Sequence, residues 1–102
     1  MLSIGAQIRK LREDQGLPLR KVAAKLDIDQ SILSKIERGE RKASKDHIIQ
    51  IAEIFNVDKK DLLINYLSDK VLYELIDEDF AVDALKVAEK KIIYASKTQN
   101  GK

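Results

Sequence analysis

The chain has 102 residues, of which 35% are charged, and it contains no cysteine. This length predicts one domain, or one small domain with an appendage, and the missing cysteines exclude both a disulfide framework and a thiolate metal site. No stretch of about 18 residues is apolar, and charges follow too soon after the first residue for a signal peptide, so we expect a cytoplasmic protein without a membrane segment.

The formal net charge of +2 conceals an uneven distribution along the chain. Residues 9–45 hold 11 Lys and Arg against 6 Asp and Glu, whereas residues 46–102 hold 8 against 11. A basic half beside an acidic half is typical of a protein that places one surface on a polyanion. A solvated face of uneven charge gives the same pattern, so the charge alone leaves both interpretations open.

Apolar periodicity predicts five short helices within residues 4–67, at about 4–15, 18–26, 30–38, 45–56 and 58–67. Their ends carry the usual signals: Asp29 and Ser44 are suited to begin helices, and Gly16 and Gly39 to follow them. No alternating stretch predicts a strand, which indicates an all-α fold. The expected inward-facing residues are Ile4, Ile8, Leu11, Val22, Ala23, Leu26, Leu33, Ile36, Ile48, Ile49, Ala52, Phe55, Leu62, Leu63 and Tyr66.

The last third of the chain, residues 68–102, has a different character. Ser68 is expected to cap a further helix, the acidic residues 77–79 to interrupt it, and a longer helix to follow from Phe80 to about Lys97. That last helix is apolar over more than one face, which indicates burial against a second copy of the chain. Helix 58–67, through Leu62, Leu63 and Tyr66, is a competing dimer surface. The expected dimerisation residues are Leu72, Leu75, Ile76, Phe80, Val82, Leu85 and Ile92.

The sequence offers little support for catalysis or for a cofactor. His47 is the single histidine, and no nucleophile and acid are arranged around it. The adjacent carboxylates 77–79 lack the spacing of a calcium loop, and the four glycines are too scattered to cradle a phosphate. We therefore expect neither an enzyme nor a metal site.

A two-helix unit with a tight turn is present instead, and it carries a family resemblance. The segment IRKLREDQGLPLRKVAAKLDIDQSILSKIERGERKASKDHIIQIAEIFNV combines the patterns LRxxxGL, VAxxL, SxxSxIERGxR and IxxIAExFxV. It resembles the helix-turn-helix domain of the phage Cro/CI repressor superfamily, the XRE-type regulators, over about residues 4–67. The resemblance implies that the helix after Asp29 enters the DNA major groove with its N-terminal residues at the base edges.

Carried over position by position, the resemblance assigns base contacts to one face of this helix. Gln30 matches the donor and acceptor of adenine, and Lys35 matches the acceptors of guanine. Ile32 can meet a thymine methyl group, although a partly buried packing role is an equal alternative, and simple solvation is the alternative for Gln30 and Lys35. The implied base-reading residues are Gln30, Ser31, Ile32, Ser34 and Lys35.

The resemblance also implies a structural ion pair between Arg12 and Glu37. Two positions depart from the family pattern, which has Gln where this chain has Leu19 and Gly where it has Asp27. Asp tolerates the left-handed conformation that the turn needs, but the Gln contact to DNA is lost, and Arg20 or Lys21 can substitute for it. The implied contacts to the DNA backbone come from Arg20, Lys21, Arg41, Lys42, Ser44 and Lys45.

The resulting hypothesis is a sequence-specific transcriptional regulator with a DNA-binding domain at 1–67 and a helical dimerisation extension at 68–102. It would bind a palindromic operator in double-stranded DNA as a homodimer, since one recognition helix reads few base pairs. Small proteins of this kind resemble the controller proteins of restriction-modification systems, and no small-molecule effector is evident. The alternative is an antitoxin-like interaction protein whose C-terminal helices hold a partner protein and which binds DNA secondarily.

Overall fold

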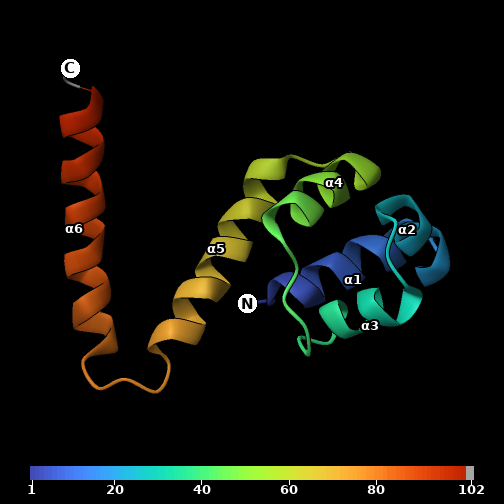
Figure 1. The fold of residues 1–102 in the computed structure, drawn as a ribbon, viewed down its shortest axis with the longest axis horizontal. Coiled ribbons are helices and arrows are strands. Elements are labelled where there is room, and N and C mark those ends of the chain that lie inside the picture. The colour runs from blue at the N-terminus through green and yellow to red at the C-terminus, as the bar shows by residue number, and fades with distance from the viewer. Residues whose placement is uncertain (101–102) are drawn as a thin grey trace. The chain divides into compact units, whose positions relative to one another are not determined.

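The computed structural model describes residues 1–100, and side chains through residue 98, as a chain of helices (Figure 1). Within this range no strand occurs, so the predicted all-α class is confirmed. The chain divides into two compact units, residues 1–70 and 71–102. The helices are α1 (Ile4–Asp14), α2 (Leu19–Leu26), α3 (Gln30–Glu37), α4 (Lys45–Phe55), α5 (Lys59–Leu75) and α6 (Ala81–Asn100).

Local signals in the sequence account for most helix ends in the first unit. The Ser3 hydroxyl accepts a hydrogen bond from the N–H of Ala6 at 3.2 Å, and the Ser44 hydroxyl accepts one from the N–H of His47 at 3.1 Å. These bonds cap α1 and α4. The Asp58 carboxylate accepts the N–H of Lys60 at 2.9 Å at the start of α5. Gly16, with φ of 66°, adopts the left-handed conformation expected beyond a helix end.

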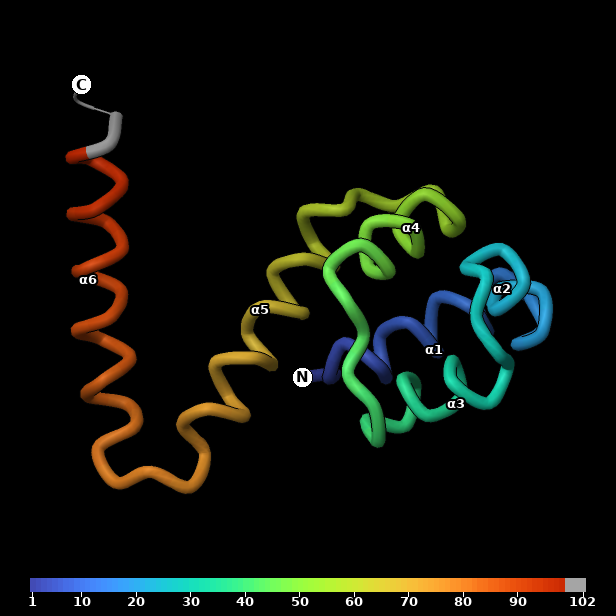
Figure 2. Tube along the Cα trace, in the orientation of Figure 1, coloured from blue at the N-terminus to red at the C-terminus, as the bar shows by residue number. Residues whose placement is uncertain are grey.

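The core of the first unit lies where α1 to α4 and the start of α5 meet, and Figure 2 shows α3 running beside α1. One predicted core position is wrong: Ile51 is fully buried, whereas Ile49 is only half-buried. Ile48, Ile51 and Phe55 follow each other at three- and four-residue spacing on one face of α4, which leaves Ile49 off that face. The buried hydrophobic residues are Ile8, Val22, Ala23, Leu26, Leu33, Ile36, Ile48, Ile51, Ala52, Phe55 and Leu62.

The predicted helix boundary at Ser68 is also wrong, because α5 continues through it to Leu75. The Ser68 hydroxyl donates to the backbone oxygen of Asn65 at 2.8 Å, a bond that a serine inside a helix commonly makes. No Gly or Pro lies between Lys59 and Leu75 to end the helix. The sequence predicts seven helices, five within residues 4–67 and two after them. The described residues form six, because α5 joins two of the predicted ones.

The second unit contains the end of α5, a turn and α6. Phe80 has a φ of 65°, which lies outside the helical region, so α6 begins at Ala81, one residue later than predicted. None of the residues 71–98 is buried in the single chain. In the part of the chain that the structure describes, no helix is long and apolar enough to cross a membrane.

Candidate nucleic-acid interface

The turn between α2 and α3 is built by a left-handed residue. Asp27 has φ of 56° and ψ of 44°, and the N–H of Ile28 donates to the Ala23 carbonyl at 3.1 Å. Ala23 retains 2% exposure where α2 meets α3, so its small side chain permits the close approach of the two helices. Asp27 thus adopts the left-handed conformation that joins the two helices.

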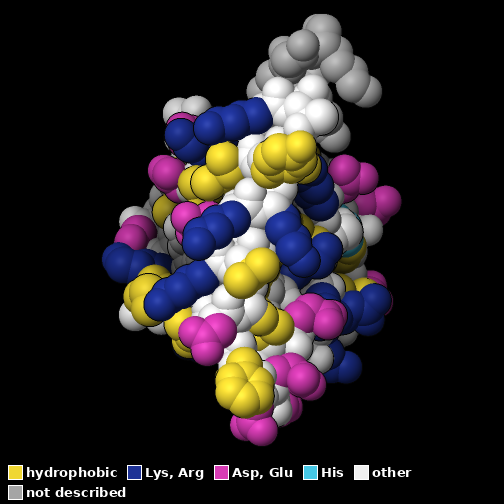
Figure 3. Space-filling view, turned by 90° about the vertical axis from the view of Figure 1, so that its left-hand side faces the viewer, with side chains coloured by type: hydrophobic (Ala, Val, Ile, Leu, Met, Phe, Trp, Pro, Cys, Tyr) yellow, Lys and Arg dark blue, Asp and Glu magenta, His cyan; other side chains and the backbone are white. Residues whose placement is uncertain are grey.

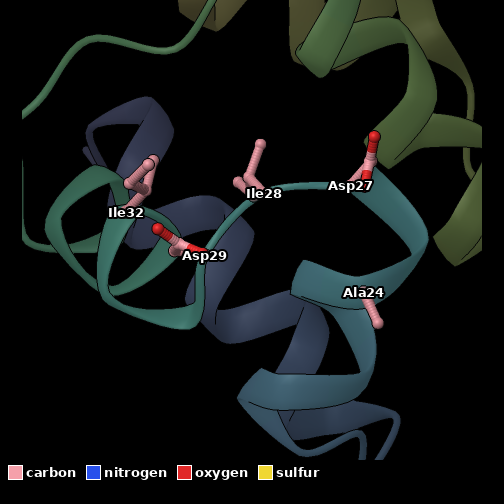
Figure 4. Close-up of a pocket in the computed structure, with 5 residues that line it drawn as sticks. All are labelled: Ala24, Asp27, Ile28, Asp29 and Ile32. Atoms are coloured by element: carbon pink, nitrogen blue, oxygen red, sulfur yellow. The ribbon is translucent and has the colours of Figure 1, made fainter.

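Asp29 occupies the N-cap position of α3, as predicted, but its side chain makes no capping hydrogen bond. Its carboxylate instead borders a surface pocket together with the side chains of the turn and of the first turn of α3. Figure 4 shows Ile28 and Ile32 projecting side by side from these two segments. The pocket is lined by Ala24, Asp27, Ile28, Asp29 and Ile32.

The inner face of α3 is anchored against α1. Leu33 and Ile36 are buried, with 0% and 3% exposure. Gly5 of α1 lies directly over the end of α3, where an added Cβ atom would overlap the backbone oxygen of Ile36 and lie 2.8 Å from that of Glu37. The missing side chain at residue 5 therefore sets how closely the two helices approach.

A buried ion pair also fixes α3 relative to α1. The Arg12 guanidinium donates to both oxygens of the Glu37 carboxylate, from Nε at 2.8 Å and from Nη2 at 3.0 Å, and Nη1 donates to the Leu17 carbonyl at 3.1 Å. These two side chains retain only 15% and 4% exposure. The hydrogen bond with Glu37 raises the pKa of Arg12, so the guanidinium stays charged at physiological pH. The ion pair positions α3 and leaves its outer face unobstructed.

The outer face of α3 carries the predicted base-reading residues. Gln30, Ser31 and Lys35 are exposed, and their spacing places them on the side opposite Leu33 and Ile36.

Two further residues predicted to contact bases, Ile32 and Ser34, are less free to do so. Ile32 is half-buried and packs against the core, in keeping with the alternative packing role. The Ser34 hydroxyl accepts a hydrogen bond from Arg38 Nη1 at 2.9 Å. Arg38, which the sequence reasoning did not select, is in turn held by Glu40, with Nε and Oε2 2.6 Å apart. This adds a positioned guanidinium at the C-terminal end of α3.

The predicted backbone-contacting residues lie at the starts of α2 and α4 and in the segment before α4. Ser44 is exposed, and its oxygen already accepts the His47 N–H, which leaves its hydroxyl proton available as a donor. Asp46 adds a carboxylate in the same turn, which weakens the attraction of this helix start for a phosphate. The exposed cationic residues of this group are Arg20, Lys21, Arg41, Lys42 and Lys45.

The sequence reasoning missed a polar support beneath α1. The Asp69 carboxylate of α5, which retains 8% exposure, accepts the N–H of Ile4 at 2.8 Å. Asn65 donates from the same Nδ2 atom to the Gln7 side chain at 2.7 Å and to the Leu2 carbonyl at 3.2 Å. Because a carboxylate is favourable at a helix N-terminus, this cluster holds α1 and, through it, α3.

The residues predicted for dimerisation fall in two groups. On α5, Leu62 is buried in the core of the first unit, and Leu63 and Tyr66 pack against that core, so these three do not form a free surface. The hydrophobic residues that this part of α5 exposes are Ile64 and Leu67 instead. Leu75 is half-buried, and the other predicted positions are exposed in the single chain: Leu72, Ile76, Phe80, Val82, Leu85 and Ile92.

Comparison with known proteins agrees with this geometry. The control protein C.BamHI of Bacillus amyloliquefaciens is 35% identical over 63 residues, which cover 61% of this chain and 78% of that protein. The restriction-modification controller protein C.AhdI of Aeromonas hydrophila is 29% identical, with a TM-score of 0.54 over 58% of this chain and 89% of that chain.

A third similar protein shows a longer match. The clp gene regulator ClgR of Corynebacterium glutamicum is 27% identical in one crystal structure, with a TM-score of 0.56 over 65% of this chain and 86% of that chain. In another crystal structure of ClgR the match covers 97% of this chain and 92% of that chain, with a TM-score of 0.57 and 21% identity, which shows the fold alone. The family model described as Helix-turn-helix matches residues 8–62, more than half of the chain. The chain therefore belongs to the Helix-turn-helix family and is an XRE-type DNA-binding regulator.

Proposed function

We propose that this chain is a transcriptional regulator of the restriction-modification controller type, which binds a palindromic operator as a homodimer through α3. The observation that carries the proposal is the arrangement around α3: its inner face is fixed by Leu33, Ile36 and the Arg12–Glu37 pair, and its outer face exposes polar side chains. A rigidly held helix with an exposed polar face is what reading of base edges requires.

Base selection is assigned to the outer face of α3. The Gln30 amide offers a donor and an acceptor for adenine N7 and N6, and the Lys35 ammonium offers donors for guanine O6 or N7. Ser31 and Ser34 supply hydroxyl groups, the latter together with Arg38, its hydrogen-bond partner. Ile32, which packs against the core, presents only the exposed part of its side chain to a thymine methyl group.

Binding strength that does not depend on sequence is assigned to the cations around α3. Charges that neutralise phosphates release counterions, so these residues make affinity depend on salt and fix the register of α3 on the duplex. The residues assigned to phosphate contacts are Arg20, Lys21, Arg41, Lys42, Ser44 and Lys45.

Two copies are needed because one recognition helix reads only a few base pairs. Half-sites about 34 Å apart, or a multiple of that distance, suit two copies related by a two-fold axis. We assign DNA binding to residues 1–67 and dimerisation to the extension 68–102. The assignment to a restriction-modification operon rests on the similarity to C.BamHI and C.AhdI, the second of which is a restriction-modification controller.

The proposal is tested by comparing two substitutions on two DNAs. The cognate operator is first obtained by selecting bound sequences from a random DNA pool with the unmodified protein. Gln30→Ala should cost about 1–3 kcal/mol per half-site on that operator and much less on random DNA, because it removes a base contact. Arg41→Ala should weaken binding to both DNAs by a similar factor. It should also reduce the slope of log binding constant against log salt concentration by about 1.

Binding is measured by fluorescence anisotropy across a salt series, with folding checked by circular dichroism. Lys59→Ala, at the start of α5 and outside the assigned surface, is the matched control. It should leave the affinity for both DNAs unchanged. If Gln30→Ala weakens binding to both DNAs equally and Arg41→Ala abolishes base preference, α3 is not the helix that enters the major groove.

A further inference from the structure

The second unit cannot be stable as the single chain presents it. The helix α6 has 20 residues, yet none of its described side chains is buried. Val82, Ile92 and Tyr94 remain 65%, 66% and 73% exposed. An isolated helix of this length is marginal in water and takes its stability from the burial of an apolar face, so α6 requires a partner surface.

One stripe of α6 has the regular spacing of a helix–helix contact. Its residues follow each other at intervals of four and three, and they alternate between a small and a large side chain: Ala81, Leu85, Ala88, Ile92 and Ala95. Figure 3 shows hydrophobic and basic side chains interleaved along this helix.

The alternation of small and large side chains distinguishes two ways of pairing α6 with a copy of itself. A parallel, in-register pair would stack Leu85 on Leu85 and Ala88 on Ala88, so bulky layers would alternate with underfilled ones. An antiparallel pair can place Leu85 against Ala88 of the second copy and Ile92 against Ala81 of the second copy. Every layer then combines one large and one small residue, which fills the contact evenly.

The charges of the second unit favour the same orientation. Residues 74–83 contain five acidic and no basic side chains, whereas residues 86–97 contain four lysines and one glutamate. A parallel pair would bring like charges together at both ends. An antiparallel pair places the acidic segment of one copy beside the basic segment of the other, and this complementarity selects the orientation.

We propose that α6 binds α6 of a second copy in antiparallel orientation, through Ala81, Leu85, Ala88 and Ile92 of this stripe. This inference rests on the homodimer of the proposed function and adds its orientation and contact surface. The two copies would thereby be related by a two-fold axis that crosses α6 between Leu85 and Ala88, and the two DNA-binding units would be joined through it.

Cysteine crosslinking tests the orientation, because the chain has no cysteine of its own. Ala81→Cys and Ile92→Cys, which this register places opposite each other, are made in separate full-length chains, one of which carries a size tag, and the two are produced alone and together. Under mild oxidation the mixed sample should form a disulfide-linked heterodimer, while neither variant alone should link to itself. Lys90→Cys, off the stripe, is the matched control and should not crosslink.

The other outcomes separate the failure of this inference from that of the proposed function. Self-crosslinking of Ala81→Cys and of Ile92→Cys would show parallel pairing and overturn the inference. A dimer by light scattering that binds the operator but gives no crosslink would also overturn it, while the proposed function stands. A monomer that binds no DNA selectively would overturn both. Helical content of each variant is checked by circular dichroism before oxidation.

Discussion

The two units of this chain use similar side chains in opposite ways. Residues 1–70 bury eleven hydrophobic side chains around α1 to α5, whereas residues 71–98 bury none, although α6 is rich in Ala, Val, Leu and Ile. The first unit has several helices that can cover each other's apolar faces. The second has one long helix and the end of another, and this unit by itself buries none of its apolar side chains among residues 71–98.

Under the proposed function, this difference would separate the two tasks of a dimeric DNA-binding regulator. Reading base edges needs a helix that is held in place, and the first unit supplies this through the anchors of α3. Association with another chain needs exposed apolar surface, which a stable domain avoids, and the second unit supplies it. The division of stability along the chain is therefore the property that mutations should reveal.

The largest expected effect comes from the same substitution made in each unit. Leu33→Ala should lower the free energy of unfolding by about 3–5 kcal/mol, because Leu33 is 0% exposed and its removal leaves a cavity under α3. Leu85→Ala, at a residue that is 46% exposed, should change it by less than about 0.5 kcal/mol at protein concentrations where the chain is monomeric.

Urea denaturation followed by circular dichroism measures the free energy of unfolding of both variants. Ala24→Ser, at an exposed position of α2, is the control for a surface change in the first unit. Equal losses from Leu33→Ala and Leu85→Ala would mean that the second unit folds together with the first, and the contrast between the units would be incorrect.

Much of the first unit is predictable because its signals are local. Val22, Ala23 and Leu26 lie on one face of a single short helix, and the caps at Ser44 and Asp58 depend on residues two or three positions away. Such patterns can be read along the chain without knowledge of the fold. The all-α class and the approximate starts of α1 to α5 follow from them.

One error occurs where distant residues decide the outcome. Ser68 has the chemistry of a helix cap, yet the helix continues, and Asp69 beside it is held by α1, 65 residues earlier in the chain. The Ile49 error is of a different kind. Ile48, Ile51 and Phe55 lie on one face of α4 at three- and four-residue spacing, so the periodicity of this helix already favours burial of Ile51 over Ile49.

The candidate interface was accessible to sequence reasoning in part. Family resemblance selects Gln30 and Lys35, and both are exposed on α3. It gives no indication that Ser34 and Glu40 hold Arg38, because that arrangement depends on side-chain conformations that form only in the folded chain.

An intermediate effect is expected at Asp69, where α5 supports α1. Asp69→Ala should lower the free energy of unfolding by about 1.5–2 kcal/mol, since it removes a charged acceptor from the N–H of Ile4 at a largely buried site. Asp61→Ala, at an exposed position of the same helix, is the matched control. Urea denaturation of the two variants measures the difference, and an Asp69→Ala protein as stable as the control would show that the first unit does not depend on this contact.

The smallest expected effect on unfolding, and a large one on association, comes from removing the second unit. A fragment of residues 1–70 keeps all the buried hydrophobic residues and Asp69, so its free energy of unfolding should stay within about 0.5 kcal/mol of that of the monomeric full-length chain. The full-length protein should be dimeric at micromolar concentration by light scattering, whereas the fragment should dissociate more readily. A fragment that ends at Leu67 lacks Asp69, and it should also lose stability, by about as much as Asp69→Ala does. If the 1–70 fragment dimerises as tightly as the full chain, the interface lies on the first unit, where α5 exposes Ile64 and Leu67, and α6 is left to bind a different partner.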